Sequence, residues 1–233
     1  MSITDSTSPN LDETLGALVA AKPARARVLE QFGLDYCCNG HRTVAEASTA
    51  AGLDPAAVVE RLATVSDDAG SEIDDLEPVD LVDHILETHH AYLHEELPLL
   101  VQLATKVRDV HGERHPELVR VAELVSHVHA DLAPHLAKEE QVLFPAIRDW
   151  ADGERSFPFG TLSRPVQVMM TEHDQAGELL RALRTATRDF EVPDDGCASY
   201  RALYERLEAL EADTHRHIHL ENNVLFPAVT VEP

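Results

Sequence analysis

Two distant stretches of the chain repeat the same histidine–glutamate spacing. HLAKEEQVLFPAI covers residues 135–147 and HIHLENNVLFPAV covers residues 217–229. Side chains four residues apart share one face of a helix, so His135 projects with Glu139, and His217 with Glu221. The apolar V-L-F after each pair predicts an inward face, where a carboxylate without a partner is costly. A metal cation held between the two pairs explains both the repeated spacing and the buried carboxylates.

Each repeated pair follows a single histidine on the preceding helical stretch. His90 lies in LETHHAYL and His173 in MMTEHDQAG, 45 residues (135 − 90) and 44 residues (217 − 173) before the paired histidines. Imidazole with carboxylate suits iron, manganese or zinc. Two carboxylates can bridge two ions and leave room for an oxo or hydroxo bridge and for small molecules. His89 is the alternative to His90.

Acidic residues near these histidines are candidates for supporting them. Asp131 and Asp213 lie four residues before His135 and His217, so both repeats read D-x-x-x-H-x-x-x-E. We expect them, and Glu172, to orient a ligand imidazole or to line an access path. His215 and His219 should face solvent, since each lies about 200° round the helix from His217. We also predict surface or rim positions for His84, His94, His111, His115, His127 and His129.

The adjacent Cys37 and Cys38 lie in the turn-like stretch LDYCCNGH. A disulfide between neighbouring residues strains the backbone, and adjacent thiols cannot easily share one tetrahedral metal ion. We expect them to be exposed, redox-active thiols. The alternative is two small apolar residues in a turn. Cys197 suggests no role.

The elements that position these residues read as helices. Helical spacing covers about 79–111, 116–149, 163–190 and 197–226, with Gly- and Pro-rich breaks between them. The sequence therefore predicts an all-α fold with an antiparallel four-helix bundle; a generic bundle without a cofactor is the alternative. Residues 11–65 predict short helices, with Gly33 as a stop and Asp54–Pro55 as a start. An acidic linker at 66–78 predicts domains 1–75 and 76–233.

Composition excludes several classes of protein. The formal net charge of −23 disfavours binding to nucleic acid or to an anionic membrane. The first residues do not resemble a signal peptide, and no apolar run reaches the length of a membrane span. Three cysteines are too few for a disulfide scaffold. We expect a cytoplasmic protein; the oligomeric state stays open, with a homodimer as one arrangement.

Several of these stretches together resemble a known family. DYCCNG, the acidic linker, HHAYLHEELPLL, HLAKEEQVLFP, TEHDQAGELL and HIHLENNVLFP are similar to the repair-of-iron-centres (RIC) proteins. These are hemerythrin-like proteins with a small ScdA-type N-terminal domain. The resemblance covers nearly the whole chain. It departs in one place, because CCNG stands where many members carry CCGG.

The resemblance implies a cofactor and a ligand set. It implies two non-haem iron ions bridged by two glutamates and an oxo group. The spacing of the first-helix histidine to ELP at 96–98 favours His90 over His89, and the family's cysteine pair corresponds to Cys37 and Cys38. The implied ligands are His90, His135, Glu139, His173, His217 and Glu221.

The resemblance also implies a function. RIC proteins repair iron–sulfur clusters damaged by oxidative or nitrosative stress, and supplying iron is the implied route. We expect an iron donor rather than a multi-turnover enzyme, with damaged iron–sulfur proteins as partners and NO or O₂ as small ligands. The alternatives are nitric oxide reduction at the two irons and an oxygen- or iron-binding module. A structural zinc site is disfavoured, since such sites rarely use paired bridging carboxylates.

Overall fold

The computed structural model describes residues 9–65 and 76–230, which form helices and turns and no strand. The chain divides into two compact units, Met1–Leu81 with Arg216–Pro233, and Val82–His215. The division falls inside one continuous helix, Ala198–Leu220. The expected domain boundary near residue 75, and most of the expected linker, lie outside the described residues.

Short helices with conventional caps make up the N-terminal part. Thr14 caps the first helix, Thr43 and Glu46 form a capping box, and Asp54 caps the helix that begins at Pro55. The helical spacing expected after Thr14 is interrupted at Pro23, which has no N–H to donate. Gly33, at φ +65°, follows the second helix as the predicted stop. The elements are α1 (Leu15–Ala21), η1 (Pro23–Arg25), α2 (Ala26–Gln31), α3 (Val44–Ala50) and α4 (Pro55–Ala63).

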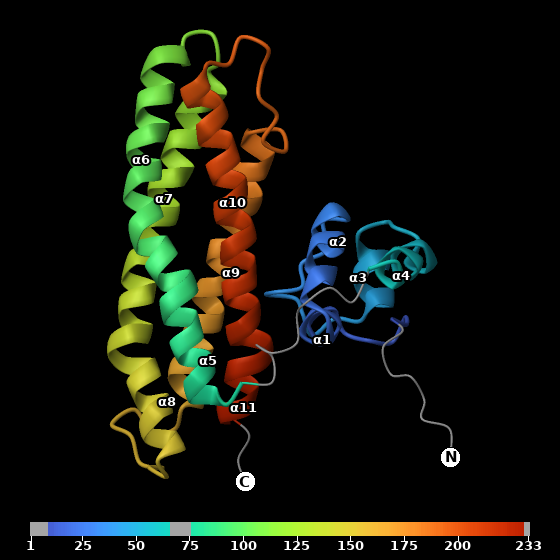
Figure 1. Ribbon diagram of the computed structural model, residues 1–233, viewed down its shortest axis with the longest axis vertical. Helices are drawn as coiled ribbons and strands as arrows, with labels where there is room; N and C mark the ends of the chain where they lie inside the picture. The colour runs from blue at the N-terminus through green and yellow to red at the C-terminus, as the bar shows by residue number, and fades with distance from the viewer. Residues whose placement is uncertain (1–8, 66–75, 231–233) are drawn as a thin grey trace. The chain divides into compact units, whose positions relative to one another are not determined.

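The larger part of the chain is the predicted antiparallel four-helix bundle (Figure 1). Helix α7 packs against both α6 and α9. Leucine and valine side chains such as Leu100, Val125 and Leu180 are fully buried between the helices. The elements are α5 (Pro78–Ile85), η2 (Leu86–His90), α6 (Ala91–His111), α7 (Glu117–Lys138), η3 (Glu139–Leu143), α8 (Phe144–Ala151), α9 (Ser163–Ala186), α10 (Ala198–Leu220), η4 (Glu221–Leu225) and α11 (Phe226–Thr230).

The third long helix is shorter than its spacing predicts. It ends at Ala186 instead of residue 190. Arg188, Asp189 and Phe190 follow with φ of 51°, 58° and 59°, a left-handed turn that a right-handed helix cannot continue into. Thr187 stabilises the turn, because its Oγ1 accepts a hydrogen bond from the Phe190 N–H at 3.2 Å.

Three of the four long helical segments of the bundle contain a π-helical turn, which the sequence did not predict. These turns are η2, η3 and η4. Pro145 and Pro227 follow η3 and η4 closely, and a proline clashes with the carbonyl four residues back in a regular α-helix. The wider π-turn moves that carbonyl away. No proline stands at the matching place after η2, and nothing in the structure explains that turn.

None of the helices within residues 9–65 and 76–230 combines the length and the apolar character needed to cross a membrane.

Candidate metal centre

Four buried side chains converge near the π-turns. His90 ends η2, His135 lies near the end of α7, Glu139 begins η3 and His173 lies midway along α9. Each is at most 2% exposed. The carboxylate of Glu139 lies at their centre, because its Oε2 is 3.3 Å from His135 Nε2 and 3.5 Å from His90 Nε2.

The third histidine faces the same carboxylate. His173 Nε2 lies 3.9 Å from Glu139 Oε1 and 3.1 Å from His135 Nε2. Three imidazoles from three helices therefore direct their Nε2 atoms toward one carboxylate.

The second predicted pair has the geometry of the first. His217 lies near the end of α10 and Glu221 begins η4. His217 Nε2 is 3.1 Å from Glu221 Oε1, and both side chains are buried. The two repeats thus give the same local structure, an α-helical histidine one turn before a glutamate that opens a π-turn.

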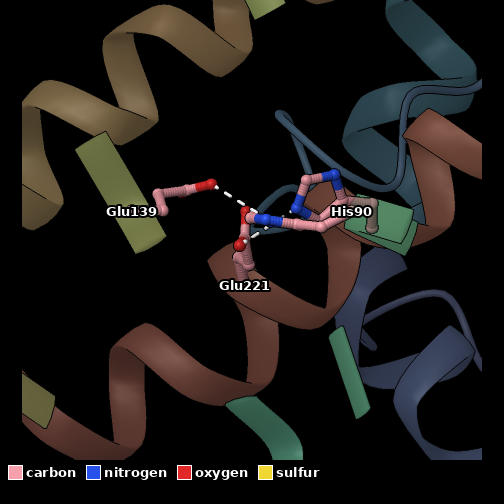
Figure 2. Close-up of side chains that lie close together, drawn as sticks. His90, Glu139 and Glu221 are labelled. Atoms are coloured by element: carbon pink, nitrogen blue, oxygen red, sulfur yellow. Dashed lines mark ion pairs between the residues drawn. The ribbon is translucent and has the colours of Figure 1, made fainter. Parts of the chain in front are cut away.

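The six residues fall into two groups with the spacing of metal ligands. One group is His90, Glu139, His217 and Glu221, and the other is His135, Glu139, His173 and Glu221. Within each group, one candidate ligand atom per residue lies within 4.8 Å of the others. Figure 2 shows the side chains of His90, Glu139 and Glu221 pointing toward one another.

This donor set fits a transition metal. Buried carboxylates are costly unless a positive charge compensates them, and imidazole nitrogen with carboxylate oxygen suits iron. The two groups share both glutamates. The structure brings His90 into the first group; His89 instead directs its Nδ1 to Asp213 Oδ1 at 2.9 Å.

Two further carboxylates hold the outer nitrogens of the histidines. Glu172 Oε2 lies 2.9 Å from His135 Nδ1 and also pairs with Lys138. Burial alone would raise the pKa of Glu172, but hydrogen bonds from Lys138 and His135 lower it below its ordinary value. The carboxylate is therefore charged at neutral pH and is suited to accept a hydrogen bond from an N–H at His135 Nδ1.

Glu140 holds His90 in the same way, and the sequence reasoning missed it. Its Oε1 lies 2.9 Å from His90 Nδ1 and 2.7 Å from His94 Nε2. Burial again favours a raised pKa, and the hydrogen bonds from His94 and His90 outweigh it and lower the pKa. The available signal was its position next to Glu139, which places it beside the ligand face.

The predicted supporting aspartates are placed differently. Asp131 is exposed on α7, and the carboxylate beside His135 is Glu172. Asp213 contacts His89.

Two histidines predicted to face solvent are buried. His219 is 3% exposed, its ring packs edge-on against Tyr36 at 5.5 Å, and burial lowers its pKa to about 4. His111 is 5% exposed. The prediction was wrong for these two because side chains from distant parts of the chain cover them. His215 and the other histidines predicted at the surface or rim are exposed or half-buried.

The cysteine turn is less exposed than expected. Cys37 is buried and Cys38 half-buried, both are free thiols, and their Sγ atoms are 3.7 Å apart. The prediction of an exposed thiol was therefore wrong for Cys37. The hydrogen bond with Cys38 and burial raise the pKa of Cys37 well above its ordinary value. Asp35 Oδ1 accepts backbone N–H bonds from Cys37 at 3.2 Å and Cys38 at 2.9 Å, and these three residues form a third candidate cation group.

The residues after Glu221 hold this turn. Asn222 and Asn223 donate side-chain N–H bonds to the Cys37 carbonyl at 3.3 and 3.1 Å. Asn223 also approaches two glycines so closely that a Cβ on Gly16 or Gly40 would lie 2.3 Å from its Oδ1. The cysteine turn is thus bound to the chain next to a candidate ligand.

Comparison with known proteins defines the class of this site and fold. Residues 81–229 match the family model of the hemerythrin HHE cation binding domain, and residues 11–66 match ScdA_N, described as a domain of unknown function. The bundle is therefore a hemerythrin-type domain, and such a domain implies iron binding.

Similarity over the full length defines the family. The iron-sulfur cluster repair protein YtfE of Escherichia coli O157:H7 is 35% identical over 217 residues, 93% of this chain and 96% of the relative. The protein of that name from Citrobacter koseri gives the same figures, and that from Escherichia fergusonii is 34% identical over the same shares. This chain belongs to the repair-of-iron-centres family.

Proposed function

We propose that this protein repairs damaged iron–sulfur clusters in the cytoplasm by supplying iron to them. Two findings support the proposal: relatives that match nearly the whole chain are named iron-sulfur cluster repair proteins, and the bundle contains a buried imidazole–carboxylate cluster. The observation that carries it is the pair of candidate ligand groups that share Glu139 and Glu221. A pair of carboxylates shared by two groups of imidazoles is suited to hold two adjacent iron ions.

The proposed ligands would divide between two ions. His90 and His217 would hold one ion, His135 and His173 would hold the other, and Glu139 and Glu221 would be shared between them. Six protein ligands would leave room at both ions for an oxo bridge and for exogenous small molecules. When bound, the irons supply both the cargo for repair and the redox chemistry of the site.

The residues around the ligands control how firmly the iron is held. Glu140 and Glu172 lie 2.9 Å from Nδ1 of His90 and of His135. In the proposed tautomers each Nδ1–H donates a hydrogen bond to its carboxylate, and each Nε2 is free to bind iron. Loss of one cargo iron leaves its ligand imidazoles and carboxylates to take up protons. Iron retention should therefore weaken as the pH falls.

The cysteine turn is the proposed route of transfer. Asp35, Cys37 and Cys38 offer two sulfurs and one carboxylate within 4.8 Å of one another. Asn222 and Asn223, which follow Glu221, bind the Cys37 carbonyl. A thiol pair bound to the chain beside the proposed ligand Glu221 is suited to receive an iron ion that leaves the cluster. Exchange of Cys37 and Cys38 for serine should slow transfer without lowering the iron content.

Isotope transfer tests the proposal directly. The protein, loaded with ⁵⁷Fe, would be incubated with a dehydratase whose cubane cluster has been opened by nitric oxide, and ⁵⁷Fe in the restored cluster would be measured by Mössbauer spectroscopy. His135→Ala and Glu221→Ala should abolish the transfer. Glu95→Gln, an exposed change on α6, should not affect it. Equal restoration by protein without iron would refute the donor role.

Nitric oxide reduction is the second candidate, favoured by the small number of protein ligands for two ions. Two NO molecules, two electrons and two protons give nitrous oxide and water. Continuous nitrous oxide production with an electron donor would establish this activity, whereas a single stoichiometric burst would argue against it.

A further inference from the structure

A second group of reactive side chains lies at the other end of the bundle. His111 is the last residue of α6, and Cys197 immediately precedes α10. His111 Nε2 lies 3.1 Å from Cys197 Sγ. The thiol is exposed, whereas the imidazole is 5% exposed. Helix α6 spans 21 residues, so this pair is about 30 Å from His90 along the helix axis.

Cys197 also occupies the N-terminal cap of a long helix. Its carbonyl accepts a hydrogen bond from the Arg201 N–H at 3.0 Å, which is the first bond of α10. Helix α10 has 23 residues, and its free N–H groups and dipole favour negative charge at this end. An anionic sulfur here faces the positive end of the helix, with a buried base in contact to take the thiol proton.

A cavity of about 470 Å³ lies beside the pair, and its lining contains neighbours of His111 but neither His111 nor Cys197. Two of its lining rings pack on His111, since the centroids of Tyr200 and His115 lie 5.6 and 6.4 Å from that of His111. The volume lies within the range of small-molecule sites.

The cavity wall carries charges of both signs. Arg114 and Arg188 contribute positive charge, and Glu117, Glu191 and Asp194 contribute negative charge. Arg114 is paired with Asp195 at 3.0 Å. Arg188 belongs to the left-handed turn after α9 and is part of the lining. Such a wall suits a ligand that carries both carboxylate and ammonium groups.

We propose that Cys197, His111 and this cavity form a thiol–disulfide exchange site for a low-molecular-weight disulfide with amino-acid character. The Cys197 thiolate attacks one sulfur of the disulfide, a new S–S bond to Cys197 forms, and the original S–S bond breaks. The leaving thiolate takes the proton that His111 removed from Cys197. Cys197 is oxidised to the mixed disulfide, and one half of the small disulfide is reduced to a thiol.

The probes are cystine, which carries both charges, and the neutral 2-hydroxyethyl disulfide. The full-length protein would react with each at pH 7, followed by acid quenching, trypsin digestion and mass spectrometry. Cleavage after Arg188 and Arg201 isolates Cys197 from Cys37 and Cys38. A synthetic peptide of residues 189–201 gives the rate of the same thiol without the fold.

In the folded protein, cystine should modify Cys197 at least about tenfold faster than it modifies the peptide. The ratio of the cystine rate to the 2-hydroxyethyl disulfide rate should also exceed that of the peptide. His111→Gln should slow both probes about tenfold, and Arg188→Gln should slow cystine alone. His127→Gln, an exposed histidine on α7, should change neither.

Two results would overturn the proposal. One is a Cys197 that reacts no faster in the protein than in the peptide, and the other is a cystine preference equal to that of the peptide. Both comparisons use the unaltered protein, so they hold even if His111→Gln fails to fold, which circular dichroism would show.

Discussion

Replacement of Glu140 by glutamine should weaken iron binding although Glu140 is outside both candidate ligand groups. Glutamine keeps the size and one hydrogen-bond acceptor but removes the negative charge. Glu140 Oε1 lies 2.9 Å from the Nδ1 of buried His90. Loss of such a partner typically costs about 10- to 100-fold in metal affinity, or about 1.4 to 2.7 kcal/mol.

Most of this cost should come from the contact with His90. The other partner, His94, lies 2.7 Å from the same oxygen, but its side chain is 50% exposed. Exposed ion pairs contribute little because solvent screens them. His94→Ala should therefore reduce iron affinity far less than Glu140→Gln.

Competition with a ferrous chelator measures the effect. Iron retained by each variant would be determined by elemental analysis after equilibration over a range of chelator concentrations. Glu95→Gln, on the same helix as His94, removes the same charge from an exposed position and serves as the matched control. The reasoning fails if Glu140→Gln retains iron like the wild type, or if Glu95→Gln loses as much.

Three further predictions concern the cysteine turn. Gly40→Ala should destabilise its unit by about 1–3 kcal/mol in urea unfolding, because the added Cβ would overlap Asn223. Asp35→Asn should cost about 1–3 kcal/mol at pH 7. Burial would raise the pKa of Asp35, but hydrogen bonds lower it below 3.8. The stabilisation by Asp35 is therefore fully present above pH 3.8 and is lost as the pH falls through the lowered pKa. The unfolding free energies of the variant and the wild type should then converge in acid. Iodoacetamide should label buried Cys37, with its raised pKa, more slowly than Cys38, as peptide mass spectrometry would show.

The long helices and the candidate ligands could be predicted because their signals are local. Apolar spacing and Pro- or Gly-rich breaks place helix ends within a few residues of the observed ones, apart from the left-handed turn that begins at Arg188. The repeat around His135 and His217 depends only on the geometry of one helical turn. Both pairs are buried, as their apolar neighbours predict.

The remaining features depend on contacts that are distant in the sequence. His219 is buried because Tyr36, far away in the chain, covers its face of the helix. His111 is buried beside Tyr200 and Cys197, which follow it by more than eighty residues. Glu140, in η3, contacts His90, in η2, although the two residues are 50 positions apart in the sequence. A helical period shows which way a side chain points but not what covers it.

The η4 turn carries both a candidate ligand and the contacts to the cysteine turn. Glu221 faces the ligand cluster, and the next two residues bind the Cys37 carbonyl. If metal binding at the cluster shifts η4, it also changes the free energy of the contacts between η4 and the cysteine turn. Thermodynamic linkage makes this coupling reciprocal. A partner that pulls the cysteine turn away from η4 would then weaken iron binding. The factor would equal that by which iron binding strengthens the contact between η4 and the cysteine turn. Under the proposed donor role, a recipient that binds the cysteine turn would thereby favour release of the iron, without a separate signal.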